Sequence, residues 1–270
     1  MDYTFAPRGN PPLISPAALA ERTARHKKIL FMVDYDGTVV PIAPTPEQAR
    51  PDKKLLKTFA RLVQKPEYTL AILSGRRLEE LIELLPVSGL YLAGVHGAWI
   101  RRPDGVVVPL VKIADGEKAI PVLYALALEV IKNQPGFIVE NKRYTLAIHY
   151  RLAEVEAAKK ILGIFIKESE KLRQQFALEL LRGKKILEVR PQGLHKGNPV
   201  SWLKKNLSGH FCIYLGDDTT DEDAFQLIAE NGLGILVSEY PRPSYASLRL
   251  KSPSEVYQFL ELIAQKNVQR

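Results

Sequence analysis

Short apolar runs alternate along the chain with segments in which apolar residues recur every three or four positions. The apolar runs lie at residues 28–36, 68–75, 90–97, 210–218 and 232–238. The amphipathic segments lie at 50–64, where Pro51 is near the start, and at 76–86, 220–231 and 252–266. A short apolar run predicts a buried strand, and the longer periodicity predicts a helix. Strands that alternate with helices indicate a parallel sheet covered by helices.

The pattern changes between about residues 115 and 188. A predicted helix (116–133) precedes two predicted strands (136–142 and 145–151), and a long helix (153–176) precedes two more (177–183 and 184–191). The alternation of polar and apolar positions in these strands is typical of a sheet with one solvent-exposed face. We interpret the segment as an inserted α+β domain of order α-β-β-α-β-β, with hinges at RRPDGVVVP and RPQGLHKG.

The predicted fold class is therefore α/β: a Rossmann-like parallel-sheet core with a smaller inserted α+β domain. The expected boundaries are 1–28 for an N-terminal leader, 29–112 and 191–270 for the two parts of the core, and 113–190 for the insertion. No run reaches the ~18 apolar residues of a membrane-spanning helix, and residues 1–28 lack the pattern of a signal peptide. We expect a cytoplasmic protein without a membrane partner.

The net charge of +8 raises the question of a nucleic-acid partner. The basic residues are scattered, however, and aromatic residues are not interleaved with the one short basic run, RTARHKK. We therefore expect no nucleic acid, and attraction of a small phosphorylated substrate or a solvated surface accounts for the charge. The single cysteine, Cys212, is expected in a buried strand, so neither an intrachain disulfide nor a cysteine zinc site is expected.

Four short polar stretches fall at predicted strand ends or at a helix start. They are DYDGT (34–38), SGR (74–76), HKG (195–197) and GDDTTDED (216–223). In an open α/β sheet, the carboxyl ends of the strands are where phosphate and metal sites lie. A calcium loop of the EF-hand type is excluded because the fifth, sixth and twelfth positions from Asp34 hold Thr38, Val39 and Thr45, so its Gly and Glu are missing.

Each stretch also has a purely structural interpretation. Ser74 after a strand suits a helix N-cap, the lysine of HKG suits a surface charge, and GDDTTDED suits a negatively charged helix start. Five acids in eight residues, however, exceed what a helix cap needs.

Taken together and in this order, the four stretches resemble the haloacid dehalogenase superfamily of phosphohydrolases. The resemblance implies that Asp34 is a nucleophile that forms an aspartyl-phosphate and that Asp36 is the general acid and then the general base. Ser74 and Lys196 would hold the phosphoryl oxygens, and Gly37 would let the chain coil after Asp34. The resemblance also implies a Mg²⁺ ion whose protein ligands are Asp34, the backbone carbonyl of Asp36 and Asp217. Asp218 and Asp221 would lie close to these ligands at the same metal site.

Longer pieces between about residues 30 and 260 are similar to the trehalose-6-phosphate phosphatase family. They include DYDGTVVPIAPTPEQA, GVHGAWIR, ENKRYTLAIHYR, GKKILEVRP and, most discriminating, GDDTTDEDAF. The resemblance implies that residues of the inserted cap hydrogen-bond the distal glucose, namely Glu140, Lys142, Lys184 and Glu188. It places further substrate contacts near the phosphate or the cap at Gly75, Arg76, His96 and Arg151. His149 and Glu188 also have structural interpretations, as a strand histidine and as a partner of a nearby lysine.

The expected activity is hydrolysis of trehalose 6-phosphate by a stand-alone, monomeric, Mg²⁺-dependent phosphatase whose partner is a small sugar phosphate. HKGNP departs from the family, which more often has Asn before the lysine. Two alternatives remain open: a phosphatase of another sugar phosphate, such as sucrose, glucosylglycerol or glucosylglycerate phosphate, and a catalytically silent regulator that binds a sugar phosphate.

Overall fold

The computed structural model describes residues 9–111 and 116–266. The chain divides into two compact units, one formed by Met1–Leu110 with His195–Arg270 and the other by Val111–Leu194. The second unit ends four residues beyond the insertion expected from the sequence. The other expected boundary, between residues 112 and 113, lies outside the described residues.

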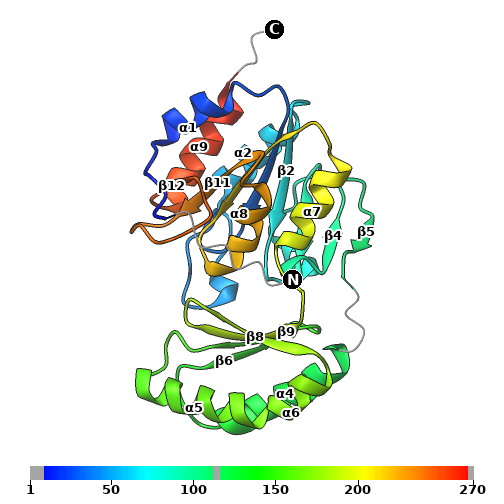
Figure 1. Cartoon of the computed structure of the whole chain (residues 1–270), viewed down its shortest axis with the longest axis vertical. Helices are drawn as coiled ribbons and strands as arrows, with labels where there is room; N and C mark the ends of the chain where they lie inside the picture. The colour runs from blue at the N-terminus through cyan, green and yellow to red at the C-terminus, as the bar shows by residue number, and fades with distance from the viewer. Residues whose placement is uncertain (1–8, 112–115, 267–270) are drawn as a thin grey trace. The chain divides into compact units, whose positions relative to one another are not determined.

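Eight strands in the described part of the first unit form one sheet, in the order β12-β11-β10-β1-β2-β3-β4-β5 (Figure 1). The strands are β1 (Ile29–Asp34), β2 (Tyr68–Leu73), β3 (Tyr91–Gly94), β4 (Trp99–Arg101), β5 (Val107–Pro109), β10 (Phe211–Gly216), β11 (Gly232–Val237) and β12 (Leu248–Leu250). Neighbours from β12 to β3 run parallel, whereas β4 and β5 run antiparallel. The predicted α/β class with a parallel-sheet core is confirmed.

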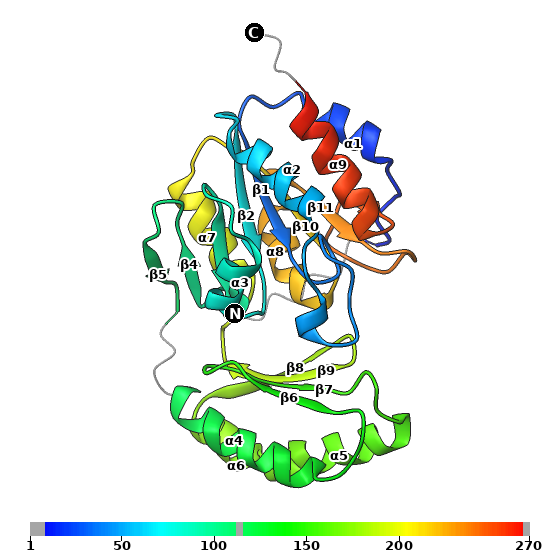
Figure 2. The ribbon, with the colours of Figure 1, turned by 180° about the vertical axis from the view of Figure 1, so that it is seen from behind.

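Both faces of this sheet are covered by helices, which is why its central strands β1, β2, β10 and β11 are largely apolar rather than alternating. On β1, Phe31 and Val33 face the helices α1 (Pro16–Thr23), α2 (Lys53–Val63), α3 (Leu78–Leu84) and α9 (Pro253–Gln265). Leu30 and Met32 face α7 (Gly197–Asn206) and α8 (Glu222–Ile228) on the other side. Figure 2 shows α2, α3 and α9 on the side opposite to α7 and α8. Cys212 is buried within β10, as predicted.

The described residues of the first unit also form three short 3₁₀ helices, η1 (Pro46–Gln48), η2 (Val95–Gly97) and η3 (Thr219–Asp221). Helix α2 begins later than the sequence pattern suggests, because Asp52 is its N-cap and accepts a hydrogen bond from the Leu55 amide at 2.7 Å. Pro51 therefore precedes the helix rather than lying inside its first turn.

The interpretation of residues 101–109 as a hinge is wrong. These residues form a hairpin, in which β4 and β5 extend the main sheet. The Arg102 amide donates to the Val106 carbonyl at 2.9 Å, and Gly105 has a positive φ of 87°. Proline followed by Asp and Gly is a turn sequence, and here the turn reverses a strand rather than separating two domains.

Residues 9–28, expected as a leader, belong to the first unit in the structure. The Ile14 amide donates to the Arg249 carbonyl at 3.0 Å, and the Arg249 amide donates to the Pro12 carbonyl at 2.9 Å. Helix α1 follows and packs against α9, with Leu19 fully buried. Because β12 is the last strand of the sheet, this segment covers an edge whose backbone groups would otherwise be open to pairing with another chain.

The second unit contains one antiparallel sheet in the order β6-β7-β9-β8. Its strands are β6 (Ile138–Asn141), β7 (Leu146–His149), β8 (Leu178–Gly183) and β9 (Ile186–Pro191), and its helices are α4 (Gly116–Ile131), α5 (Val155–Glu168) and α6 (Glu170–Gln175). The helices lie on one face of the sheet (Figure 1), where Leu146, Ile148 and Val189 pack against them. The long predicted helix is divided at Ser169 into α5 and α6.

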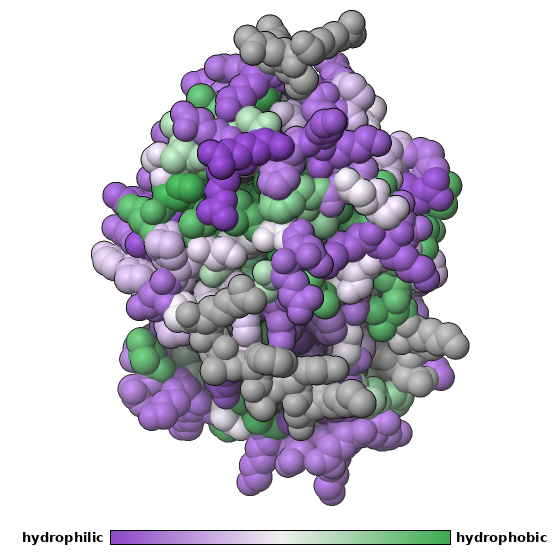
Figure 3. Space-filling model, turned by 45° about the horizontal axis from the view of Figure 1, so that its top comes forward, coloured by the Kyte–Doolittle hydropathy of each residue, from purple (hydrophilic) through white to green (hydrophobic). Residues whose placement is uncertain are grey.

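Hydrophilic and hydrophobic side chains are intermixed on the one face that Figure 3 shows. In the space-filling view, hydrophilic residues alternate with small hydrophobic patches on the face turned to the viewer (Figure 3). Among the helices that the structure describes, none is long and apolar enough to cross a membrane.

Truncation of Leu19 tests whether the N-terminal segment stabilises the core. We expect Leu19→Ala to lower the free energy of unfolding by ~2–5 kcal/mol, because it leaves a cavity between α1 and α9. Leu13→Ala is the matched control: Leu13 is 47% exposed, and its loss should cost less than about 0.5 kcal/mol. Urea unfolding of both variants measures the difference, and equal effects would contradict a core role for α1.

Candidate active site

The polar stretches identified in the sequence meet at one edge of the main sheet. Asp34 is the last residue of β1, Ser74 follows β2, and Asp217 follows β10. These are neighbouring parallel strands, with β1 between β10 and β2. Their carboxyl ends therefore bring side chains from distant parts of the sequence to the position where open α/β sheets bind ligands.

A buried lysine joins three of these segments. The Lys196 ammonium, at the start of α7, donates to Asp34 Oδ1 at 2.5 Å and to Asp221 Oδ1 at 2.7 Å. All three side chains are at most 5% exposed. Burial lowers the pKa of Lys196, but the Asp221 and Asp34 carboxylates outweigh this and raise it above its usual value, so Lys196 stays charged. Burial raises the pKa of Asp34, and Lys196 offsets this only in part.

Asp221 is the anchor of the GDDTTDED loop. Its Oδ1 accepts from the Tyr214 hydroxyl at 2.6 Å as well as from Lys196, and its Oδ2 accepts from the amides of Asp217 and Asp218 at 3.0 Å each. Both carboxylate oxygens are thus occupied within the protein. Sequence reasoning missed Tyr214, because a tyrosine inside an apolar strand gives no signal that distinguishes it from the core.

Close approach between two loops explains the glycine of DYDGT. The amides of Val39 and Val40 both donate to the Tyr35 carbonyl at 3.1 Å, so the chain turns immediately after β1. Gly37 has a φ of +88°, and a Cβ at this position would lie 2.4 Å from Asp217 Oδ2. Only glycine suits both the backbone conformation and the contact. The prediction that Gly37 lets the chain coil after Asp34 is confirmed.

The acidic residues fit a divalent cation. Carboxylate oxygens of Asp34, Asp217 and Asp221 lie within 4.8 Å of one another, and all three residues are buried. Asp34 Oδ2 is buried and has no hydrogen-bond partner. Lys196 supplies one positive charge against three carboxylates, and buried charge without compensation is unfavourable. Oxygen ligands of this kind are those that Mg²⁺ prefers.

The remaining acids of the two motifs have other contacts. Asp218 is the N-cap of η3, where its carboxylate accepts from the Thr219 amide at 2.7 Å. The Asp36 carboxylate accepts from Arg76 through both oxygens, at 2.8 Å each, from Nε and Nη2. Of the acidic residues predicted at the metal site, the structure therefore groups the side chains of Asp34, Asp217 and Asp221 and directs those of Asp36 and Asp218 elsewhere.

The SGR stretch forms a tight turn beside β2. The Ser74 hydroxyl accepts from the Arg76 amide at 3.1 Å and does not cap α3, whose N-cap is Arg77. The helix-cap interpretation of Ser74 is therefore wrong. Gly75 lies against His96, since a Cβ at Gly75 would be 2.6 Å from ring atoms of that histidine. Arg76 and His96 are both buried.

A second polar cluster lies within the other unit, on the face of its sheet opposite the helices. Lys142 Nζ is 3.4 Å from Glu188 Oε1 and 3.9 Å from Glu140 Oε2. The Thr145 hydroxyl donates to Glu188 at 2.8 Å, and His149 Nε2 lies 3.0 Å from Glu140 Oε2. Burial raises the pKa of Glu140, but Lys142 and His149 outweigh this and lower it.

Three predicted sugar-binding residues, Glu140, Lys142 and Glu188, are thus brought together. Sequence reasoning missed Thr145, although its alternation with Ala147 and His149 on one face of the strand is a usable signal. Arg151 and Lys184 lie in the turns after β7 and β8 and are exposed. Arg151 Nη2 donates to the Lys184 carbonyl at 3.0 Å.

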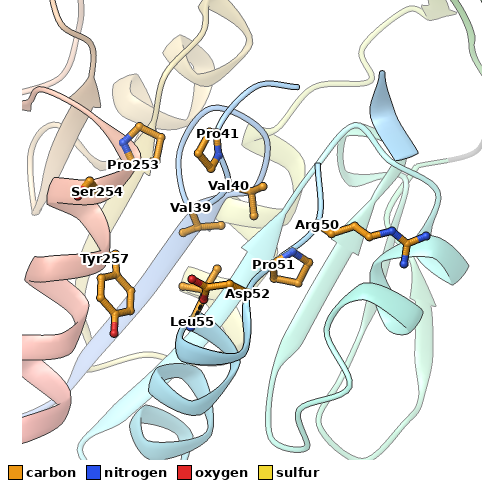
Figure 4. A pocket seen from close by; sticks show the side chains of 10 residues that line it. All are labelled: Val39, Val40, Pro41, Arg50, Pro51, Asp52, Leu55, Pro253, Ser254 and Tyr257. Carbon is orange, nitrogen blue, oxygen red and sulfur yellow. Dashed lines mark hydrogen bonds between the residues drawn. The ribbon is translucent and has the colours of Figure 1, made fainter. Parts of the chain in front are cut away.

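A pocket of about 270 Å³ in the first unit does not contain this chemistry. The loop after β1 and the first turns of α2 and α9 line it, through Val39, Val40, Pro41, Arg50, Pro51, Asp52, Leu55, Pro253, Ser254 and Tyr257. Arg50 extends away from the space between Val39 and Tyr257 (Figure 4), so no basic side chain is directed into the pocket to bind a phosphate. The acidic cluster, rather than this pocket, is the candidate active site.

A parallel-sheet core with a buried carboxylate, a lysine and a second acidic strand end defines a phosphohydrolase of the haloacid dehalogenase fold. The C-terminal domain of C. albicans trehalose-6-phosphate phosphatase superposes with a TM-score of 0.81 at 25% identity, over 95% of this chain and 99% of that domain. A sequence model described as trehalose-phosphatase matches residues 32–254. The chain belongs to the trehalose-phosphatase family.

Plant relatives are similar over most of their length. Probable trehalose-phosphate phosphatase H of Arabidopsis thaliana is 32% identical over 262 residues, which cover 88% of this chain and 72% of the relative. Probable trehalose-phosphate phosphatase 4 of Oryza sativa is 34% identical over 269 residues, which cover 96% of this chain and 72% of the relative. The C-terminal domain of a Candida albicans trehalose synthase regulatory protein has a TM-score of 0.75 at 14% identity, over 94% of this chain and all of that one, which shows a shared fold alone.

The role of Asp221 as an anchor predicts a selective loss of stability. Asp221→Asn replaces one accepting oxygen by an NH₂ group that faces the donors of Lys196 and Tyr214 or of the backbone. We expect the free energy of unfolding to fall by about 3–5 kcal/mol, as for other broken buried ion pairs. Asp218→Asn is the control: Asn and Asp cap helices equally well, and the change should be below about 0.5 kcal/mol. Urea unfolding with a chelator present measures both, and similar losses would argue against the anchor.

Proposed function

We propose that the protein hydrolyses trehalose 6-phosphate to trehalose and inorganic phosphate. The observation that carries the proposal is the state of Asp34: one carboxylate oxygen is held by Lys196, and the other is buried without a partner inside the acidic group. A carboxylate that is fixed at one oxygen and directed at a cation site at the other suits nucleophilic attack on phosphorus.

The reaction then has two steps. Asp34 attacks phosphorus, the ester P–O bond breaks, and the sugar oxygen leaves with a proton from Asp36. A water molecule next attacks the aspartyl-phosphate, gives its proton to Asp36 and releases phosphate, which restores Asp34. General acid and base catalysis of this kind contributes about 10²–10⁴-fold.

The protein groups around Asp34 would offset the charge of the phosphoryl group. Lys196 provides a fixed positive charge, and the Ser74 hydroxyl and the Gly75 amide would donate to phosphoryl oxygens. Mg²⁺, held by Asp34, Asp217 and the Asp36 carbonyl, would neutralise charge between the nucleophile and the phosphate. We assign Asp221 and Asp218 to the support of this loop, since their carboxylates already accept hydrogen bonds from the protein.

The polar cluster of the second unit would recognise the sugar. Carboxylates accept hydrogen bonds from sugar hydroxyls, and a lysine donates to them. Glu140, Lys142 and Glu188 supply both types within one cluster. The exposed Lys184 and Arg151, together with His96, are further proposed substrate contacts.

The identity of the substrate is inferred from the names of the relatives, and another sugar phosphate is the alternative. A catalytically silent regulator is disfavoured, because binding alone does not require both Asp34 and Asp36 beside Lys196. We further propose a cytoplasmic monomer without nucleic-acid or membrane partners; the scattered basic residues support the absence of a nucleic-acid partner.

Replacement of the nucleophile tests the chemistry. Asp34→Asn should lower phosphate release from trehalose 6-phosphate by at least about 10³-fold, because the amide does not form the aspartyl-phosphate. Asp52→Asn, at the exposed cap of α2, should leave the rate unchanged. A panel of sugar phosphates completes the experiment: equal rates on unrelated monosaccharide phosphates would refute the proposed specificity.

Replacement of a cap-cluster carboxylate tests sugar recognition. Glu188→Gln should lower kcat/KM for trehalose 6-phosphate by about 10²-fold and change turnover of p-nitrophenyl phosphate little, because only the sugar uses the cluster. Glu179→Gln is the control, since Glu179 pairs with Arg190 in the same sheet. Equal losses on both substrates would contradict the assignment.

A further inference from the structure

The Arg76 guanidinium is bound almost completely within the protein. Its Nε and Nη2 donate to the two oxygens of Asp36, Nη2 also donates to the Pro46 carbonyl at 2.8 Å, and Nη1 donates to Glu80. These contacts use four of the five N–H donors that a guanidinium carries. The side chain is only 6% exposed, so few donors remain for a phosphate.

The surroundings of Arg76 fix its orientation. The guanidinium carbon lies 5.1 Å from the centroid of the Tyr35 ring, and Tyr35 is itself fully buried, with its hydroxyl donating to the Ala49 carbonyl at 3.0 Å. Burial lowers the pKa of Arg76, but Asp36 and Glu80 outweigh this, so the arginine remains charged. Arg76 is therefore a rigid part of the core.

Asp36, in contrast, has few other constraints. It lies in the turn after β1, its side chain is 39% exposed, and its two hydrogen bonds described above both come from Arg76. A planar fork that binds both oxygens fixes the plane of the carboxylate, and a lysine at the same place does not. A proton donor must be held near its productive orientation to be effective.

We propose that Arg76 is a positioning residue that orients the Asp36 carboxylate for proton transfer, rather than a ligand of the substrate phosphate as its place in SGR suggested. The proposal rests on the proposed function, in which Asp36 protonates the leaving sugar. Arg76 touches neither substrate nor cation in this role, and it acts only through Asp36.

The dependence of the rate on the leaving group distinguishes a role of Arg76 in positioning Asp36 from a role in binding the phosphate. A sugar alkoxide needs a proton to leave, whereas p-nitrophenolate leaves without one. Arg76→Lys should lower kcat/KM for trehalose 6-phosphate by about 10²-fold, within the range of general acid catalysis. The first-turnover burst of p-nitrophenol from p-nitrophenyl phosphate should stay within about threefold of the wild-type rate. The inhibition constant of inorganic phosphate should also be unchanged.

Two further variants complete the experiment. In an Asp36→Asn background, Arg76→Lys should have no further effect on trehalose 6-phosphate, because residues that act as a unit are not additive. Arg61→Lys is the matched control: Arg61 pairs with Glu261 at 43% exposure, and its replacement should leave both activities unchanged. The retained burst shows that the Arg76→Lys protein is folded.

Three results would overturn the proposal: a burst that falls as much as sugar-phosphate turnover, a weakened inhibition by phosphate, or additive losses in the double variant. Failure of the proposed function is distinguishable, because it would appear as a wild-type protein that gives the p-nitrophenol burst but does not turn over trehalose 6-phosphate. The burst and the phosphate inhibition would then still decide whether Arg76 binds the phosphoryl group.

Discussion

The edge of the main sheet that carries the candidate active site depends on one buried ammonium group. Lys196 binds Asp34 at the end of β1 and Asp221 in the loop after β10, and it lies itself at the start of α7. Removing these charges from water is costly, and the cost is offset only by short contacts and by the further donors that Asp221 receives from Tyr214 and the backbone. The excess negative charge of the acidic group is what makes the same place a candidate cation site.

Two lysines of this chain each lie between two carboxylates, yet their contacts differ. Lys196 is 2.5 and 2.7 Å from its partners, whereas Lys142 is 3.4 and 3.9 Å from Glu188 and Glu140. Strong charge-assisted contacts are ~2.7–2.9 Å long. The first lysine is fixed in one position, as the proposed chemistry at phosphorus would require. The second lies farther from both of its carboxylates, and such longer contacts would suit the proposed role of this cluster in binding sugar hydroxyls.

The sequence predicts the sheet, the insertion and the acidic strand ends, because these follow from local periodicity and from residue type at strand ends. It does not predict which polar groups pair. Arg76 and Asp36 are 40 residues apart, and nothing local distinguishes an arginine that binds a carboxylate from one that binds a phosphate. Pro103 and Gly105 suggested a hinge, but proline and glycine are equally typical of hairpin turns, so the sequence alone does not distinguish the two. The covering role of residues 9–14 depends on β12, which no sequence pattern identified.

The order of strands in the main sheet also has a consequence for biosynthesis. Strand β1 lies between β2, which soon follows it in the sequence, and β10, which follows only after the second unit. Lys196 and Asp34 are 162 positions apart. A growing chain therefore holds β1 with one edge unpaired while residues 111–194 leave the ribosome, and contacts over such separations form slowly. Nascent chains of this topology therefore expose an edge of β1 to aggregation until β10 has been synthesised.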